Sequence, residues 1–126
     1  MKNTLLAVCF SALVLSTVAN AGVNGNYQVK GTETQNGEKY TFTGTVTVSN
    51  YKSGTYALKF SDGERVNYKF NFTKPLKETI ASQTVNAFNS QGTSTATLFQ
   101  NGAKPSIKFT YKSKNGSVRG SGSGSK

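Results

Sequence analysis

Histidine and tryptophan are absent from this sequence of 126 residues, and its single cysteine, Cys9, lies close to the start. Without histidine there is no imidazole base and no imidazole metal ligand. After residue 9 there is no thiol, which excludes thiolate catalysis, thiolate zinc sites and disulfide bonds from the rest of the chain. These absences remove most of the residue sets that enzymes and metalloproteins use.

Acidic residues are few as well, with five against fifteen lysines and arginines and a formal net charge of +10. Four of the acids flank two predicted turns, where acids commonly favour solubility and turn formation: Glu33, Glu38, Asp62 and Glu64. Nothing places either pair in a pocket, so a carboxylate pair for glycoside hydrolysis is the weaker interpretation. No calcium loop or nucleotide-binding glycine motif occurs. We therefore expect no enzymatic activity, no metal and no cofactor.

Residues 1–21 have the pattern of a cleaved secretory signal peptide. A lysine precedes an apolar stretch at 5–18, and Ala-Asn-Ala at 19–21 supplies a cleavage site of small residues. The apolar stretch is shorter than the roughly 20 residues that a membrane-spanning helix requires. We expect a bacterial protein that is exported to the periplasm or secreted, with Gly22 as the first residue after cleavage.

From residue 22 onward, hydrophobic and polar residues alternate along almost the whole chain. Between residues 40 and 48, one face carries tyrosine, phenylalanine, glycine and valine, and the other carries threonine. This alternation is typical of strands with one buried and one solvated face. Asn-Gly or Asp-Gly pairs at 36–37, 62–63, 101–102 and 115–116 favour tight hairpin turns. The pattern predicts eight strands, at about 25–34, 38–49, 54–61, 64–73, 78–88, 93–100, 104–113 and 116–123.

We predict an all-β fold in which the eight strands form an antiparallel up-and-down meander. Every connection is short, and short connections force consecutive strands to lie side by side in opposite directions. Closure into a small barrel removes both sheet edges. An open sheet or a sandwich is the alternative. The barrel domain then spans residues 22–119, and the Gly/Ser-rich residues 120–126 form a flexible tail or the end of the last strand.

A partial resemblance agrees with this fold. From Tyr27 the sequence reads Tyr-x-Val-x-Gly-Thr, continues through Asn36-Gly37 to Gly-Thr-Val-Thr-Val at 44–48, and reaches Asp-Gly at 62–63. This pattern covers less than half of the chain and resembles small secreted bacterial β-meander proteins, some of them lipocalin-like. The resemblance implies a fold and carries over no activity or site residue.

The basic residues form the first candidate binding surface. Six of them fall at outward positions of the predicted strands: Lys30, Lys59, Lys69, Lys108, Lys112 and Arg119. In a closed barrel those on strands 1, 7 and 8 form one patch, and those on strands 3 and 4 form a separate one. We expect contact with an anionic glycan, lipopolysaccharide or lipid surface. A solvated lysine face is the alternative, and nucleic acid is disfavoured because the aromatic residues lie on the opposite face.

The barrel interior is the second candidate site. An eight-stranded barrel has room for packed side chains or for one small ligand. Five inward tyrosines are the candidate contacts, because buried hydroxyls need partners: Tyr27, Tyr40, Tyr56, Tyr68 and Tyr111. A carrier of a small apolar ligand is therefore the second functional hypothesis, with a simply filled core as its alternative. A small outer-membrane barrel with aromatic residues facing lipid is the third.

Overall fold

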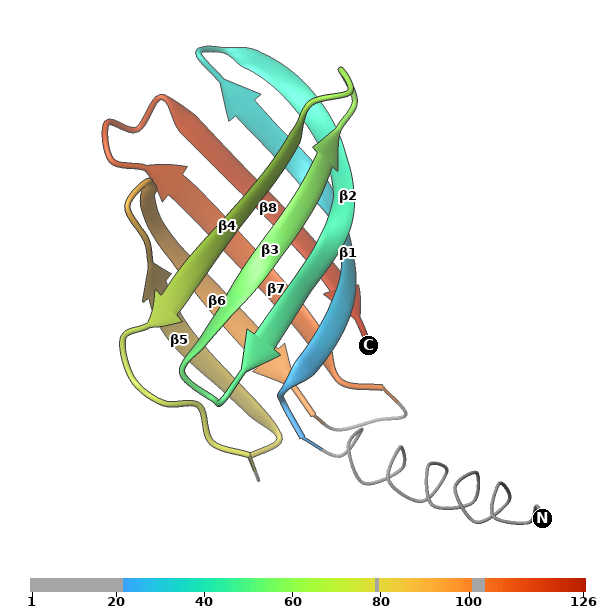
Figure 1. Cartoon of the computed structure of the whole chain (residues 1–126), viewed down its shortest axis with the longest axis vertical. Coiled ribbons are helices and arrows are strands. Elements are labelled where there is room, and N and C mark those ends of the chain that lie inside the picture. Colours follow the sequence, from blue (N-terminus) through green and yellow to red (C-terminus); the bar gives the residue numbers. More distant parts are fainter. Residues whose placement is uncertain (1–21, 79, 101–103) are drawn as a thin grey trace, which may run out of the picture.

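Eight antiparallel strands close into a barrel in which each strand pairs with its sequence neighbours and β8 pairs with β1 (Figure 1). The computed structural model describes residues 22–78, 80–100 and 104–126. The predicted signal peptide and the Asn-Gly pair at 101–102 lie outside these residues. The predicted all-β meander and its closure are confirmed, and the open sheet and the sandwich are excluded.

The strands begin and end within a few residues of their predicted positions. Their bounds are β1 Gly25–Gln35, β2 Glu38–Ser49, β3 Ser53–Phe60, β4 Arg65–Phe72, β5 Ser82–Phe88, β6 Gly92–Phe99, β7 Ser106–Ser113 and β8 Val118–Ser125. The largest difference is at β5, which begins at Ser82 instead of residue 78. In the connection before β5, the N–H of Lys77 donates a hydrogen bond to Oε1 of Gln83 at 2.8 Å. Nε2 of Gln83 donates a second one to the Lys77 carbonyl at 2.5 Å. These bonds hold the connection in a turn and delay the start of the strand.

Left-handed backbone conformations explain the tight turns. Asn36 and Gly37 have φ angles of 50° and 90°, and Gly63 and Gly116 have φ angles of 95° and 76°. A Cβ atom at Gly37 or Gly63 would meet nothing within 4 Å, so the conformation alone favours glycine there. The Asn-Gly and Asp-Gly pairs therefore set the hairpins through their backbone preference.

The Gly/Ser-rich end of the chain forms β8 and pairs on both sides, with β1 and with β7. Of the two predicted alternatives for residues 120–126, the structure has strand as far as Ser125. Its glycines alternate with exposed Arg119, Ser121 and Ser123. A Cβ atom would lie 2.7 Å from the ring of Phe109 at Gly122 and 2.3 Å from that of Tyr111 at Gly120, so these two glycines make room for inward aromatic rings.

One end of the barrel, where β1 begins, is closed by packed side chains. Val23, Tyr27 and Val48 are almost completely buried there. The Tyr27 hydroxyl donates a hydrogen bond to the Val23 carbonyl at 2.7 Å, and the Lys126 ammonium lies 5.7 Å from the centre of its ring. The N–H of Leu76, from the β4–β5 connection, bonds the carbonyl of Tyr51 at 2.7 Å. Any internal space must therefore lie farther along the barrel.

Most aromatic side chains point inward, and the basic residues of the strands point outward. The buried core includes Tyr27, Phe42, Phe60 and Phe72, whereas Lys30 and the other strand lysines are exposed. An outer-membrane barrel needs the reverse, with apolar residues facing lipid. The third functional hypothesis therefore disagrees with the observed orientation of the side chains.

Candidate functional site

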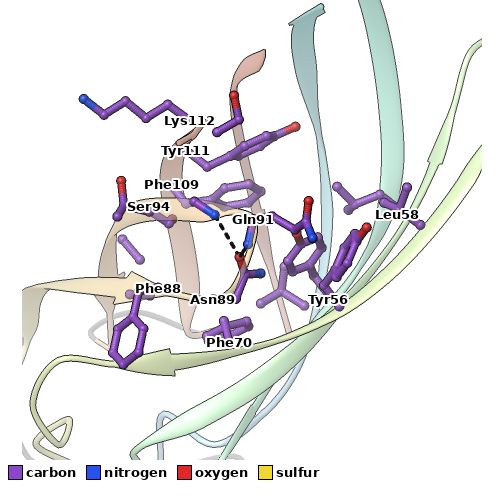
Figure 2. A pocket seen from close by; sticks show the side chains of 18 of the residues that line it. Tyr56, Leu58, Phe70, Phe88, Asn89, Gln91, Ser94, Phe109, Tyr111 and Lys112 are labelled. Carbon is purple, nitrogen blue, oxygen red and sulfur yellow. Dashed lines mark hydrogen bonds between the residues drawn. The ribbon is translucent and has the colours of Figure 1, made fainter. Parts of the chain in front are cut away.

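A cavity of about 240 Å³ lies inside the barrel between two groups of aromatic rings (Figure 2). On β3 and β4, the ring centre of Tyr56 lies 5.8 Å from that of Tyr68 and 6.4 Å from that of Phe70. On β7, Phe109 and Tyr111 stack with their centres 6.2 Å apart. Aliphatic side chains complete most of the wall, among them Val46, Leu58, Val66, Ala96, Ile107 and Val118. The cavity is therefore predominantly apolar.

Small inward residues on β5 and β6 create the space. Ala87, Gly92, Ser94 and Ala96 line the cavity on these strands, whereas the inward positions of β3 and β4 carry large rings. Large side chains on one wall with small ones on the other leave unfilled volume between them. The cavity thus results from the way in which large and small inward side chains face each other across the barrel.

The cavity opens where β4 separates from β5. The two strands pair only through Asn71 and Phe72, so among the described residues the part of β4 from Arg65 to Lys69 has no partner strand on this side. Tyr68, which faces inward, remains 39% exposed because this part of the wall is open. The gap therefore gives the apolar interior access to solvent.

The rim of this opening is held by Asn89 in the β5–β6 turn. Its Nδ2 donates a hydrogen bond to the Lys69 carbonyl at 3.2 Å. Its Oδ1 accepts hydrogen bonds from the N–H groups of Gln91 and Gly92, at 2.8 and 3.1 Å (dashed in Figure 2). Next to it, Phe88 points outward and is 46% exposed. The side chain of Asn89 thus ties the turn to the free edge of β4.

One buried carboxylate faces the cavity. Glu33 is only 7% exposed and lies among the residues that line the space. The Tyr111 hydroxyl donates a hydrogen bond to its Oε1, and Gln35 donates one to its Oε2 at 2.5 Å. None of the described lysines or arginines forms an ion pair with it. An acidic group with only neutral hydrogen-bond partners therefore lies at the wall of a predominantly apolar cavity.

The environment of the cavity raises the pKa values of two tyrosines, Tyr111 and Tyr56. Burial raises the pKa of Tyr111 well above its usual value, and its hydrogen bond to Glu33 and the negative charge there raise it further. Burial likewise raises the pKa of Tyr56, whereas a hydrogen bond with Asn89 lowers it and electrostatic interactions with Tyr68 and Glu33 raise it. Both hydroxyls stay protonated near neutral pH and can donate hydrogen bonds.

Three of the five predicted tyrosines come together at this site. Tyr56, Tyr68 and Tyr111 line the cavity. Tyr27 lies in the closed end instead, and the Tyr40 hydroxyl bonds Glu38 at the exposed β1–β2 hairpin, at 3.2 Å.

The sequence interpretation of Glu33 as a turn residue is wrong. Its burial and its contact with Tyr111 place it inside the barrel. The signal that identifies it is the alternation of β1, in which Tyr27, Val29 and Glu33 all lie on the inward face. The acids Glu38, Asp62 and Glu64 are exposed, as expected for turn residues.

The predicted basic residues are all exposed, and strand pairing joins them differently from the prediction. Lys30 pairs with Ser123, which pairs with Lys108. On the other side Lys30 pairs with Thr43, which pairs with Lys59. Members of the two expected patches therefore lie in one row across the barrel, which we call the basic row: Lys59, Lys30 and Lys108. Its members are two strands apart, or about 10 Å.

The other three basic residues lie off this row. Lys112 and Arg119 are direct cross-strand partners on β7 and β8. Lys69 faces Thr55 on the neighbouring strand. Together with the basic row, they make this outer surface strongly positive.

No family model, curated protein or solved structure matches this chain. Within the described residues there is no cluster of three or more potential metal-ligating side chains. The described part also contains no helix that is long and apolar enough to cross a membrane. The observations on which a function can be based are therefore the internal cavity and the basic outer surface of the barrel.

Proposed function

We propose that this protein is a carrier that holds a small, predominantly apolar ligand inside its barrel. The cavity itself carries this proposal, because protein interiors are normally packed with few voids larger than a water molecule. This void instead measures about 240 Å³, is lined by aromatic rings and opens to solvent beside β4. If the predicted signal peptide directs export, the carrier acts in the periplasm or outside the cell.

The size of the cavity limits the ligand. An apolar cavity of about 150 Å³ is large enough for benzene, and pockets for drug-sized molecules begin at about 300 Å³. The space in this barrel lies between these values. It therefore suits a single ring with a short substituent, or a branched chain of similar volume.

Filling the cavity from its small-residue wall tests the proposal. Ala96 is buried, lies on β6 and lines the cavity. We expect Ala96→Leu to weaken the binding of phenethyl alcohol, measured by isothermal titration calorimetry, by about tenfold or more, because the larger side chain occupies the same space.

A matched variant controls for the added side chain itself. Ala57 is exposed on the outer face of β3, so Ala57→Leu adds the same atoms outside the barrel. It should leave the affinity within about twofold of the wild type. Equal affinities for all three proteins, or no binding to the wild type, would contradict a carrier function in this cavity.

A second candidate function is contact with an anionic glycan, lipopolysaccharide or lipid surface. The observation that favours it is the continuity of the basic row, in which the residues between the lysines are Thr43 and Ser123 and not acids. Spaced cations without intervening acids suit a polyanion. Both functions are compatible on one molecule, because one uses the inside of the barrel and the other its outside.

A further inference from the structure

Glu33 is the one carboxylate among the described residues that line the cavity. An ionised carboxylate has about four acceptor positions, and the described residues supply two donors, the Tyr111 hydroxyl and the Gln35 amide. Both donors are neutral. A buried carboxylate is stabilised most by a cation or by several charge-assisted hydrogen bonds. The site therefore has an acceptor capacity that a positively charged ligand group would complement.

The surroundings of Glu33 suit a cation for a second reason. Tyr111 bonds its carboxylate directly, and Tyr111 stacks on Phe109 in the wall. The faces of aromatic rings carry partial negative charge and attract ammonium groups. The carboxylate of Glu33 and the rings of Tyr111 and Phe109 therefore both favour a positively charged nitrogen in this cavity.

None of the lysines in the described part of the chain forms an ion pair with Glu33. Lys112 reaches the rim, but its side chain points away from Tyr111 and out of the cavity (Figure 2). The exposed lysines of the outer face repel a cation, yet exposed charges are largely screened beyond about 8 Å at physiological ionic strength. The local carboxylate therefore dominates inside the cavity.

We infer that the ligand is a small protonated amine, whose nitrogen donates hydrogen bonds to Glu33 and whose single ring or short apolar group lies between the aromatic walls. This inference rests on the proposed carrier function and names the chemical class of its ligand. The volume of about 240 Å³ accommodates one ring with a short aminoalkyl chain.

Three probes of nearly equal size and different charge test the inference on the wild-type protein. These are phenethylamine, a cation at neutral pH, phenethyl alcohol, which is neutral, and phenylacetate, an anion. By isothermal titration calorimetry, we expect the amine to bind about tenfold more tightly than the alcohol. Phenylacetate should bind most weakly, because its carboxylate would lie near that of Glu33.

A variant then assigns the preference to Glu33. Glu33→Gln keeps the size of the side chain and removes its charge, so the affinity for the amine should fall to about that of the alcohol. The affinity for the alcohol should change by less than about threefold. Glu38→Gln is the control, because Glu38 is exposed on the same hairpin, and it should keep the full preference for the amine.

The possible outcomes separate this inference from the carrier function. If the alcohol binds as tightly as the amine, or if Glu33→Gln keeps the preference, the amine assignment is overturned and the carrier function remains. If none of the three probes binds, the carrier function itself is overturned. If Glu33→Gln does not fold, the comparison of the three probes on the wild-type protein still shows whether the cavity prefers an amine.

Discussion

Two inward tyrosines show how position within one barrel separates a structural from a ligand-binding role. The Tyr27 hydroxyl is bonded to the backbone carbonyl of Val23 in the closed end, where nothing is left for a ligand to contact. The Tyr111 hydroxyl is bonded to a carboxylate at the wall of the cavity. Removal of these two hydroxyls should therefore affect different properties, stability for Tyr27 and ligand recognition for Tyr111.

For Tyr27→Phe we expect the free energy of unfolding at neutral pH to fall by about 1–2 kcal/mol, because the Val23 carbonyl loses its buried donor. Burial raises the pKa of Tyr27 from 10.0 to about 12. The folded state therefore holds this proton more tightly than the unfolded state, and its contribution to stability is complete below pH 10 and lost as the pH rises towards 12.

Urea unfolding at pH 9 and pH 11 checks this prediction. The variant should lose less stability than the wild type between the two pH values, while the affinity for phenethyl alcohol stays unchanged. An equal loss in both proteins would show that Tyr27 does not keep its proton through burial.

Part of the site can be predicted from the residues of β1 alone. The alternation of β1 is sufficient to place Glu33 inside the barrel. Its position close to a turn in the sequence suggests instead that it is exposed. Its partner Tyr111 is 78 residues away in the sequence. Only the pairing of β1 with β8 and of β8 with β7 brings the two together. The contact therefore depends on barrel closure and register, which no local pattern contains.

At the scale of the element, β8 shows how glycine and serine can form a central part of a barrel wall. The strand has almost no hydrophobic side chains of its own, and its stability comes from pairing on both edges and from the rings that lie over its glycines. Composition alone therefore leaves strand and flexible tail as equal alternatives. The decisive fact is the match between inward glycines on β8 and large rings on its neighbours.

Gly122→Ala tests this match. Its Cβ atom would lie 2.7 Å from the Phe109 ring and 3.0 Å from the Lys30 carbonyl oxygen, so the ring and the backbone must move. We expect the free energy of unfolding, measured by urea denaturation, to fall by about 1–3 kcal/mol. Ser123→Ala, on the exposed face of the same strand, should change it by less than about 0.5 kcal/mol. A neutral Gly122→Ala would contradict the packing described for β8.

The gap between β4 and β5 is a second structural feature that the sequence pattern does not predict. The alternation predicts a strand from residue 78, whereas β5 begins at Ser82 and pairs with β4 only at its far end. In this register the residues opposite Arg65–Lys69 would follow Phe88, but the chain turns at Asn89 and continues into β6. The turn at Asn89 therefore leaves the opening through which the cavity meets solvent.

At the scale of the whole molecule, the barrel separates an apolar inside from a basic outside. Strand count, order and closure follow from alternation and short turns. The cavity does not, because its volume depends on how large rings on β3, β4 and β7 face small residues on β5 and β6. The single basic row likewise depends on the register that makes Lys30 a neighbour of both Thr43 and Ser123.

The basic row predicts salt-sensitive retention on a heparin column. The double variant Lys30→Glu with Lys108→Glu should elute at clearly lower salt than the wild type, because it reverses two of the spaced cations. Lys52→Glu with Lys77→Glu changes the net charge by the same amount at exposed positions outside the row, and should have a smaller effect. Equal shifts for the two double variants would show that only net charge matters and that the row is a solvated surface.

The most direct test of the carrier function is a residue-resolved NMR titration of the wild-type protein with phenethylamine and phenethyl alcohol. We predict chemical-shift changes at amides on the cavity wall, including Tyr56, Ala96 and Tyr111, and no saturable change at Val23 or Tyr27 in the closed end. Shift changes confined to the outer face, or none at the cavity for either probe, would contradict it.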